Sequence, residues 1–152
     1  MPARFELKHF KELTTYELYG ILRLRQRVFV LEQNCAFVDN DNLDQPSWHL
    51  MYYNDDNILA AYCRLLPLDV AYPGYASIGR VVSDPAMRKE GYGILLMTEA
   101  LVRCRELFGE APLKIGAQLY LKRFYEIYGF MAIGDVYIED DIEHIHMIRE
   151  KA

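Results

Sequence analysis

A six-residue segment in the second half of the chain has the composition of a phosphate-binding turn. It lies between an expected strand and a strongly patterned helix, and it reads Arg88-Lys89-Glu90-Gly91-Tyr92-Gly93. The start of a helix offers unpaired backbone N–H groups and the positive end of the helix dipole, while glycine lets the backbone approach a bulky anion closely. A guanidinium such as that of Arg88 suits phosphate oxygens. The segment therefore predicts a site for a diphosphate group.

Two better-known phosphate motifs do not fit this turn. A dinucleotide fingerprint requires G-x-G-x-x-G, and Leu96 stands where the third glycine belongs. A Walker loop requires Gly-Lys followed by Ser or Thr, which this turn lacks. For the six residues taken alone, an ordinary glycine-containing loop is the other alternative, because short motifs recur by chance.

Length and composition indicate one folded domain. The chain has 152 residues, of which 52% are hydrophobic, and this suits a single domain over residues 1–152 with one core. A net charge of -5 without a run of Lys or Arg argues against a nucleic-acid partner. No segment has the character of a signal peptide or a membrane span, so no membrane partner is expected. Three widely spaced cysteines indicate reduced thiols in a cytoplasmic protein: Cys35, Cys63 and Cys104.

Apolar periodicity predicts strands that alternate with helices, as in a mixed α/β or α+β fold. A capping-box pair, Thr14 and Glu17, opens a helix whose apolar stripe continues to Phe29. Arg25 falls on that stripe and will need a partner if it is buried. Further helices are expected over residues 93–108 and 119–128. Strands are expected over residues 5–10, 48–53, 58–66, 76–83, 113–118, 131–137 and 144–149.

The turn and its surroundings together resemble the GNAT superfamily of acyl-CoA N-acyltransferases. The resemblance rests on Arg-x-x-Gly-x-Gly after the strand end Arg80-Val81-Val82, followed by a helix, a strand and the segment Phe124-Tyr125-Glu126-Ile127-Tyr128-Gly129-Phe130. Residues 24–35, with Gly116-Ala117-Gln118 and His144-Ile145, resemble the ElaA-like bacterial branch and extend the similarity over nearly the whole chain. One departure is Glu90, where many relatives carry Lys or Arg.

This resemblance implies a fold and a co-substrate. The fold is a mixed, mostly antiparallel sheet, splayed at a bulge on its fourth strand and flanked by about four helices. The co-substrate is acetyl-CoA, whose pantetheine arm would pair with the fourth strand as an added strand. No metal is expected, because His144 and His146 share a strand face but are too few ligands. The implied coenzyme site comprises Arg80, Val81, Val82, Arg88, Lys89, Glu90, Gly91, Tyr92, Gly93 and Tyr125.

The resemblance also implies direct transfer of the acetyl group to an amine, either a small molecule or a peptide or protein. The N–H of Val82 would stabilise the oxyanion, and Tyr125 would protonate the leaving thiolate. The general base is left open between three residues and water-mediated deprotonation. Glu32 follows the first helix, His49 begins a strand, and His144 lies on the last hairpin.

Two other functions stay open at this point. The first is a catalytically inert acyl-CoA-binding or regulatory module on the same fold, and the second is a structural domain without a coenzyme site. Tyr125 and the intact turn favour the enzyme, whereas Glu90 favours the inert module. The acidic segment of residues 139–143 is either a solvated turn or a surface that attracts a cationic amine. The identity of the acceptor and the oligomeric state, a homodimer included, are left open.

Overall fold

Residues 2–150 are described by a computed structural model of the chain, in which seven strands form two antiparallel sheets. The first sheet has the order β1 (Arg4–His9), β2 (Trp48–Tyr53), β3 (Leu59–Leu66) and β4 (Ser77–Ser83). The second has the order β5 (Leu113–Gln118), β7 (Ile142–Arg149) and β6 (Met131–Glu139). Each strand begins and ends close to its expected bounds, because short runs of apolar and aromatic residues bounded by turn residues are a local signal.

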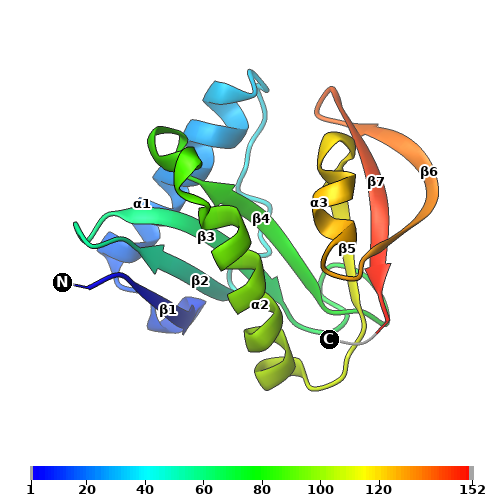
Figure 1. Ribbon diagram of the computed structural model, residues 1–152, viewed down its shortest axis with the longest axis horizontal. Coiled ribbons are helices and arrows are strands. Elements are labelled where there is room, and N and C mark those ends of the chain that lie inside the picture. The colour runs from blue at the N-terminus through cyan, green and yellow to red at the C-terminus, as the bar shows by residue number, and fades with distance from the viewer. Residues whose placement is uncertain (1, 151–152) are drawn as a thin grey trace.

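The two sheets meet at one end and separate at the other. A parallel bridge joins Ala76, just before β4, to Leu113, the first residue of β5. There the Ala76 N–H donates to Pro112 O at 3.0 Å, and the Lys114 N–H donates to Ala76 O at 3.0 Å. Beyond the bridge the strands diverge, as Figure 1 shows between the labels β4 and β5. The splayed sheet is thus the one that the GNAT resemblance implies.

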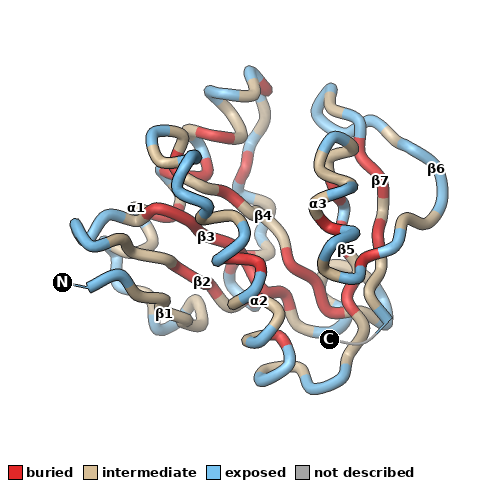
Figure 2. The backbone as a smooth tube through the Cα atoms, in the orientation of Figure 1, coloured by how far each residue is buried: buried red, intermediate tan, exposed pale blue. Residues whose placement is uncertain are grey.

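Helices cover both faces of the first sheet. On one face α1 (Thr15–Arg25) packs with Met51, Tyr62 and Val82. On the other face α2 (Tyr92–Phe108) packs with alternate residues such as Leu50 and Cys63. Figure 2 shows the resulting concentration of buried residues on the central strands and the exposure of the outer strand β6. Within the described part of the chain, no helix is long and apolar enough to cross a membrane.

Two helices differ from their expected form. Thr14 and Glu17 make the expected capping box, but the α-helix ends at Arg25 and continues as a π-helix, η2 (Gln26–Glu32). The segment 119–128 forms a 3-10 turn, η4 (Leu119–Leu121), followed by the short helix α3 (Lys122–Glu126). Apolar periodicity does not separate these tighter and wider turns from an α-helix. Two more 3-10 turns are η1 (Phe10–Glu12) and η3 (Pro85–Glu90).

Arg25 is fully buried and has the partners that its position on the apolar stripe requires. Its Nε donates to the Asp39 carboxylate and its Nη1 to the Asp44 carboxylate, both at 2.7 Å. The same two carboxylates accept from Arg80 Nε at 2.7 Å and Arg64 Nη1 at 2.8 Å, respectively. The resulting network fastens the loop after η2 to β3 and β4. With Asp41, which Arg64 also contacts, three arginines face three aspartates.

Candidate active site

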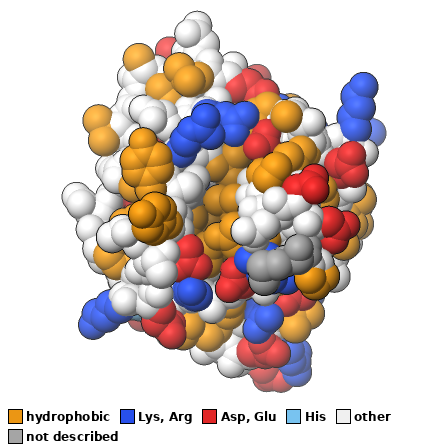
Figure 3. Space-filling model, turned by 90° about the vertical axis from the view of Figure 1, so that its left-hand side faces the viewer, with side chains coloured by type: hydrophobic (Ala, Val, Ile, Leu, Met, Phe, Trp, Pro, Cys, Tyr) orange, Lys and Arg blue, Asp and Glu red, His pale blue; other side chains and the backbone are white. Residues whose placement is uncertain are grey.

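A cavity of about 470 Å³ occupies the space where the two sheets separate. One wall is β4 from Ile78 to Ser83, and the opposite wall is formed by residues of β5, η4 and α3. Residues of η2 and the loop after it, of η3 and the start of α2, and of the β6–β7 hairpin complete the lining. On the face of the molecule in Figure 3, Lys and Arg side chains are interspersed with Asp and Glu, so that face carries no field of a single sign.

The β4 wall contains the bulge. Tyr62 pairs with Val82 and Arg64 pairs with Gly79, so β4 has one residue more than β3 over this stretch. Arg80 takes up the extra length with a φ of 51°, in the left-handed region. Its side chain is held by Asp39 and is therefore directed to the loop after η2. A bulge of this kind interrupts regular pairing and bends the strand, and pairing resumes at Val82 and Ser83.

Successive N–H groups of β4 point alternately to β3 and to the open edge, and the hydrogen bonds with β3 show which ones face the cavity. The Asp84 N–H donates to Ala60 O on β3 at 2.8 Å. Because main-chain groups alternate sides along a strand, the N–H of Val82 also points to β3, while those of Val81 and Ser83 point to the open edge. The expected oxyanion donor, Val82, thus pairs with Tyr62, and the bulge places the amide of Val81 toward the cavity instead.

The phosphate-binding turn lies at the end of this open edge. Gly91 has a φ of 76°, which a residue with a side chain rarely adopts, and α2 begins directly after it. Arg88 and Gly93 line the cavity, and a Cβ at Gly93 would have only the Phe124 ring within 4.0 Å. The first amides of α2 have no partner within their own helix. The turn can therefore hold an anion, as its sequence predicts.

The rest of the turn faces away from the cavity. Lys89, Glu90 and Gly91 are exposed, and their side chains do not line the cavity wall. The ring of Tyr92 packs against Tyr52 of β2, with 5.2 Å between the ring centroids. Any contact of these four residues with a diphosphate would consequently come from their main chain. Glu90, the departure from the usual pattern, places its charge in solvent.

Arg88 and Glu32 are joined in an ion pair at the cavity. Both guanidinium Nη atoms donate to the two carboxylate oxygens, with Nη1 to Oε2 at 2.6 Å. The two side chains are 42% and 38% exposed, and both line the cavity. The expected phosphate ligand and one expected base are therefore bonded to each other.

Tyr125 lies in the cavity wall with 7% of its surface exposed. Phe124 and Phe130 pack against its ring, with centroids at 5.2 and 6.0 Å. Burial raises the pKa of the Tyr125 phenol above its usual range and keeps it protonated at neutral pH. Burial also raises the pKa of the neighbouring Cys63 thiol.

The three expected bases have different surroundings. His49 is fully buried outside the cavity, where Nε2 lies 3.0 Å from Asp44 O and Nδ1 lies 2.7 Å from the Tyr62 hydroxyl. Burial lowers the pKa of His49, so it is a neutral structural residue. His144 lines the cavity and donates from Nδ1 to Ile142 O at 2.7 Å. The cavity therefore contains Glu32 and His144 but not His49.

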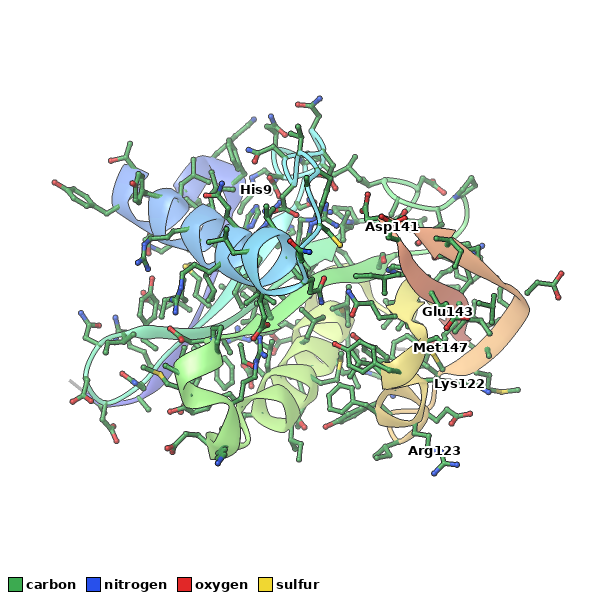
Figure 4. All side chains as sticks on the ribbon, turned by 90° about the horizontal axis from the view of Figure 1, so that it is seen from above. His9, Lys122, Arg123, Asp141, Glu143 and Met147 are labelled. Atoms are coloured by element: carbon green, nitrogen blue, oxygen red, sulfur yellow. The ribbon has the colours of Figure 1, made fainter. Side chains whose placement is uncertain are left out.

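The cavity includes residues to which the sequence assigned no role. The amides of Gln33 and Gln118 contact each other at 3.2 Å across 85 residues of chain. The Cys35 thiol donates to Asp140 O at 3.0 Å, so the loop after η2 lies against the β6–β7 turn. Figure 4 shows this turn, marked by Asp141, beside that loop. These contacts join segments distant in sequence, so no local sequence pattern predicts them.

Comparisons with known proteins agree with this geometry. The family profile described as Acetyltransferase (GNAT) domain matches residues 16–151. Protein ElaA of Escherichia coli is 40% identical over 144 residues, 93% of each chain. An acyl-CoA N-acyltransferase of Pseudomonas aeruginosa has a structure with a TM-score of 0.90 and 44% identity, covering 97% of this chain and 99% of its own. The crystal structure of E. coli ElaA gives a TM-score of 0.89 with 37% identity over 97% and 99%. The chain belongs to the GNAT acetyltransferase family.

A metal has no evident place in this site. Within residues 2–150, no group of three or more His, Cys, Asp or Glu side chains is arranged to hold a metal ion. His144 and His146 lie on the same face of β7, where the ring of Tyr137 stacks on both, with centroids 5.6 and 4.6 Å away. Their proximity is thus accounted for by packing with an aromatic ring.

Proposed function

We propose that the protein transfers the acetyl group of acetyl-CoA to an amine. The observation that carries the proposal is the open edge of β4, with the amides of Val81 and Ser83 facing a cavity that ends at the start of α2. An extended chain with amide groups, such as pantetheine, can pair with such an edge as an added strand. The diphosphate that follows it would lie at the amides between Arg88 and Gly93.

The residues of the cavity supply the groups that acetyl transfer requires. With the pantetheine paired along this edge, the Val81 N–H would donate to the thioester carbonyl, and one such donor contributes about 3–4 kcal/mol to the stability of an oxyanion. Tyr125, which stays protonated at neutral pH, would transfer its proton to the leaving thiolate.

His144 is the base that the geometry favours. Its Nδ1–H is engaged by Ile142 O, so the lone pair is on Nε2. This nitrogen can accept the proton of an ammonium group that enters the cavity. Glu32 is the second candidate, and it becomes available only when its pair with Arg88 opens.

The protein is proposed to act in the cytoplasm, where thiols stay reduced. Its three cysteines are all free and buried. The acceptor can be a small molecule or an amine of a peptide or protein, since the cavity opens to the surface beside exposed side chains such as Glu139.

A melting experiment tests whether the coenzyme site exists. Acetyl-CoA at a hundred times its dissociation constant should stabilise the fold by about 2.7 kcal/mol. For a domain of this size the melting temperature should rise by roughly 5–11 °C. Absence of a shift would favour a structural domain. A shift without release of thiol in the presence of any amine would favour an inert acyl-CoA-binding module.

A further inference from the structure

The end of the cavity near the β6–β7 turn differs in chemistry from the coenzyme wall. We call it the acceptor arm and define it by six lining residues: Gln33, Cys35, Phe37, Gln118, Glu139 and His144. They come from the loop after η2, the end of β5 and the β6–β7 hairpin. The hydrogen bond from Cys35 to Asp140 O joins the loop after η2 to the β6–β7 turn at this end of the cavity.

The acceptor arm carries the negative charge of Glu139, with which no Lys or Arg of residues 2–150 pairs. Arg80 and Arg88 are the Lys or Arg residues among the described residues that line the cavity, and each is engaged by a carboxylate. Asp39 binds Arg80 at Nε and accepts from its Nη2 through its carbonyl. Glu139 lies 3.7 Å from His144 Nε2 and has no Lys or Arg partner in the described part of the chain.

His144 supplies a second, independent observation. Its side chain is more than nine-tenths buried, and it lines the cavity. Its Nδ1 is satisfied by Ile142 O, whereas the 3.7 Å between Nε2 and Glu139 is too long for a hydrogen bond. Among residues 2–150, Nε2 has no hydrogen-bond partner, so this nitrogen is available to a ligand.

We infer that the acceptor is a small primary amine with a second positive charge and without a carboxylate. The reacting ammonium gives its proton to His144 Nε2, and its nitrogen attacks the thioester carbon. The carbon–sulfur bond then breaks, and the sulfur receives the Tyr125 proton. The attacking nitrogen releases its second proton, which returns to the Tyr125 phenolate through water, and the proton on His144 passes to solvent, so the products are an amide, a free thiol and one proton. The second cationic group pairs with Glu139. A carboxylate there would meet Glu139 and find no free guanidinium. This inference rests on the proposed function.

Three substrates that differ only at one end test the inference. Butane-1,4-diamine, pentylamine and 5-aminopentanoate carry an ammonium, a methyl and a carboxylate group at that end. Thiol release from acetyl-CoA should give the highest kcat/KM with the diamine and the lowest with the amino acid. Glu139→Gln should raise KM for the diamine up to about fivefold, the effect of one exposed ion pair, and should change KM for pentylamine much less.

A matched variant separates the ion pair with Glu139 from the general negative electrostatic field of the β6–β7 hairpin. Glu143 carries the same charge four residues further on, is exposed, and does not line the cavity. Figure 4 shows Glu143 and Asp141 on the same hairpin. Glu143→Gln should leave the preference for the diamine intact. An equal loss of kcat/KM for the diamine in Glu139→Gln and Glu143→Gln would overturn the inference. So would a preference for pentylamine, or no turnover of the diamine. A melting shift with acetyl-CoA in any of these cases would leave the coenzyme site standing.

Discussion

Arg88 of η3 and Glu32 of η2 form a bidentate ion pair across 56 residues of chain. The guanidinium that suits a diphosphate is therefore already engaged by a carboxylate at the same cavity. Binding of the coenzyme through Arg88 must open this pair, and opening it frees Glu32 beside the acceptor arm. The side chain of Arg88 therefore connects coenzyme binding with the negative charge of Glu32 near the acceptor.

Glu32→Gln should strengthen the binding of acetyl-CoA. The variant removes an anion that competes with the diphosphate for Arg88, and a partly exposed pair contributes about 0.2–1 kcal/mol, so the dissociation constant should fall up to about fivefold. Isothermal titration calorimetry measures it. Glu99→Gln is the control, because it breaks a different exposed pair, with Arg103 at 2.7 Å. Weaker binding of the coenzyme by Glu32→Gln would show that no such competition exists.

Tyr125→Phe should lower the turnover number by about a hundredfold, the lower end of what a general acid contributes. The ring and its packing on Phe124 and Phe130 are kept, so the affinity for acetyl-CoA should be nearly unchanged. Steady-state thiol release gives the first quantity and calorimetry the second. Tyr128→Phe, which removes a hydroxyl next to the same Phe124 ring, should have little effect. Equal turnover in wild type and Tyr125→Phe would remove this residue from the mechanism.

His144→Ala should lose activity that added imidazole restores. The substitution opens a space at the position of a ring that takes the proton of the amine, and free imidazole can occupy this space. Acetyl transfer would be followed with increasing imidazole at constant pH. His146→Ala, on the same face of β7, serves as the control and should not respond to imidazole in this way. Loss of activity without any rescue would indicate that His144 only supports the hairpin.

Arg25→Met should destabilise the protein by about 3–5 kcal/mol, although methionine fills much of the same volume. The variant leaves two buried carboxylates, Asp39 and Asp44, without their shared partner. Urea unfolding measures the free energy of unfolding. Arg27→Ala removes a half-buried arginine whose pair with Asp84 lies at 3.2 Å, and it should cost less than about 1 kcal/mol. A similar loss of unfolding free energy in Arg25→Met and Arg27→Ala would contradict the importance assigned to the buried network.

Stability should fall with pH in the range where Asp41 becomes protonated. Burial opposes ionisation of this carboxyl, but its hydrogen bonds with Arg64 and the charge of Arg64 outweigh burial and lower its pKa from 3.8 to about 2. The unfolded state therefore takes up the proton first, and stability present above about pH 4 is lost as the pH falls toward 2. The amount is about 2 kcal/mol. Urea unfolding from pH 5 to 2 should show this decline, and Asp41→Asn should flatten it.

Local sequence patterns predicted the framework of the site well. Strand bounds followed from short apolar and aromatic runs bounded by turn residues, and the capping box at Thr14 and Glu17 depends only on neighbours in the chain. The stripe position of Arg25 predicted a buried charge that needs partners. The glycine turn was placed at the start of a helix because Gly91 and the apolar spacing of α2 are both visible in the sequence.

Features that depend on distant contacts or on hydrogen-bond phase were not predictable in this way. His49 was a candidate base until the register placed it opposite Arg64, within the buried network. The pairing of Glu32 with Arg88 joins two elements whose approach no local pattern encodes. Val82 was expected to present its N–H to the cavity, but one extra residue in the bulge reverses which amide faces the open edge. The resemblance predicted the bulge but not which amides of β4 face the open edge.

Amide chemical shifts measured by NMR during titration with acetyl-CoA would show where the coenzyme lies. The largest changes should fall on two groups of backbone N–H signals, those of Val81 and Ser83 and those of residues 89–93. Binding of the coenzyme that left these signals unchanged and shifted signals on another face of the molecule would contradict a site between the open edge of β4 and the start of α2.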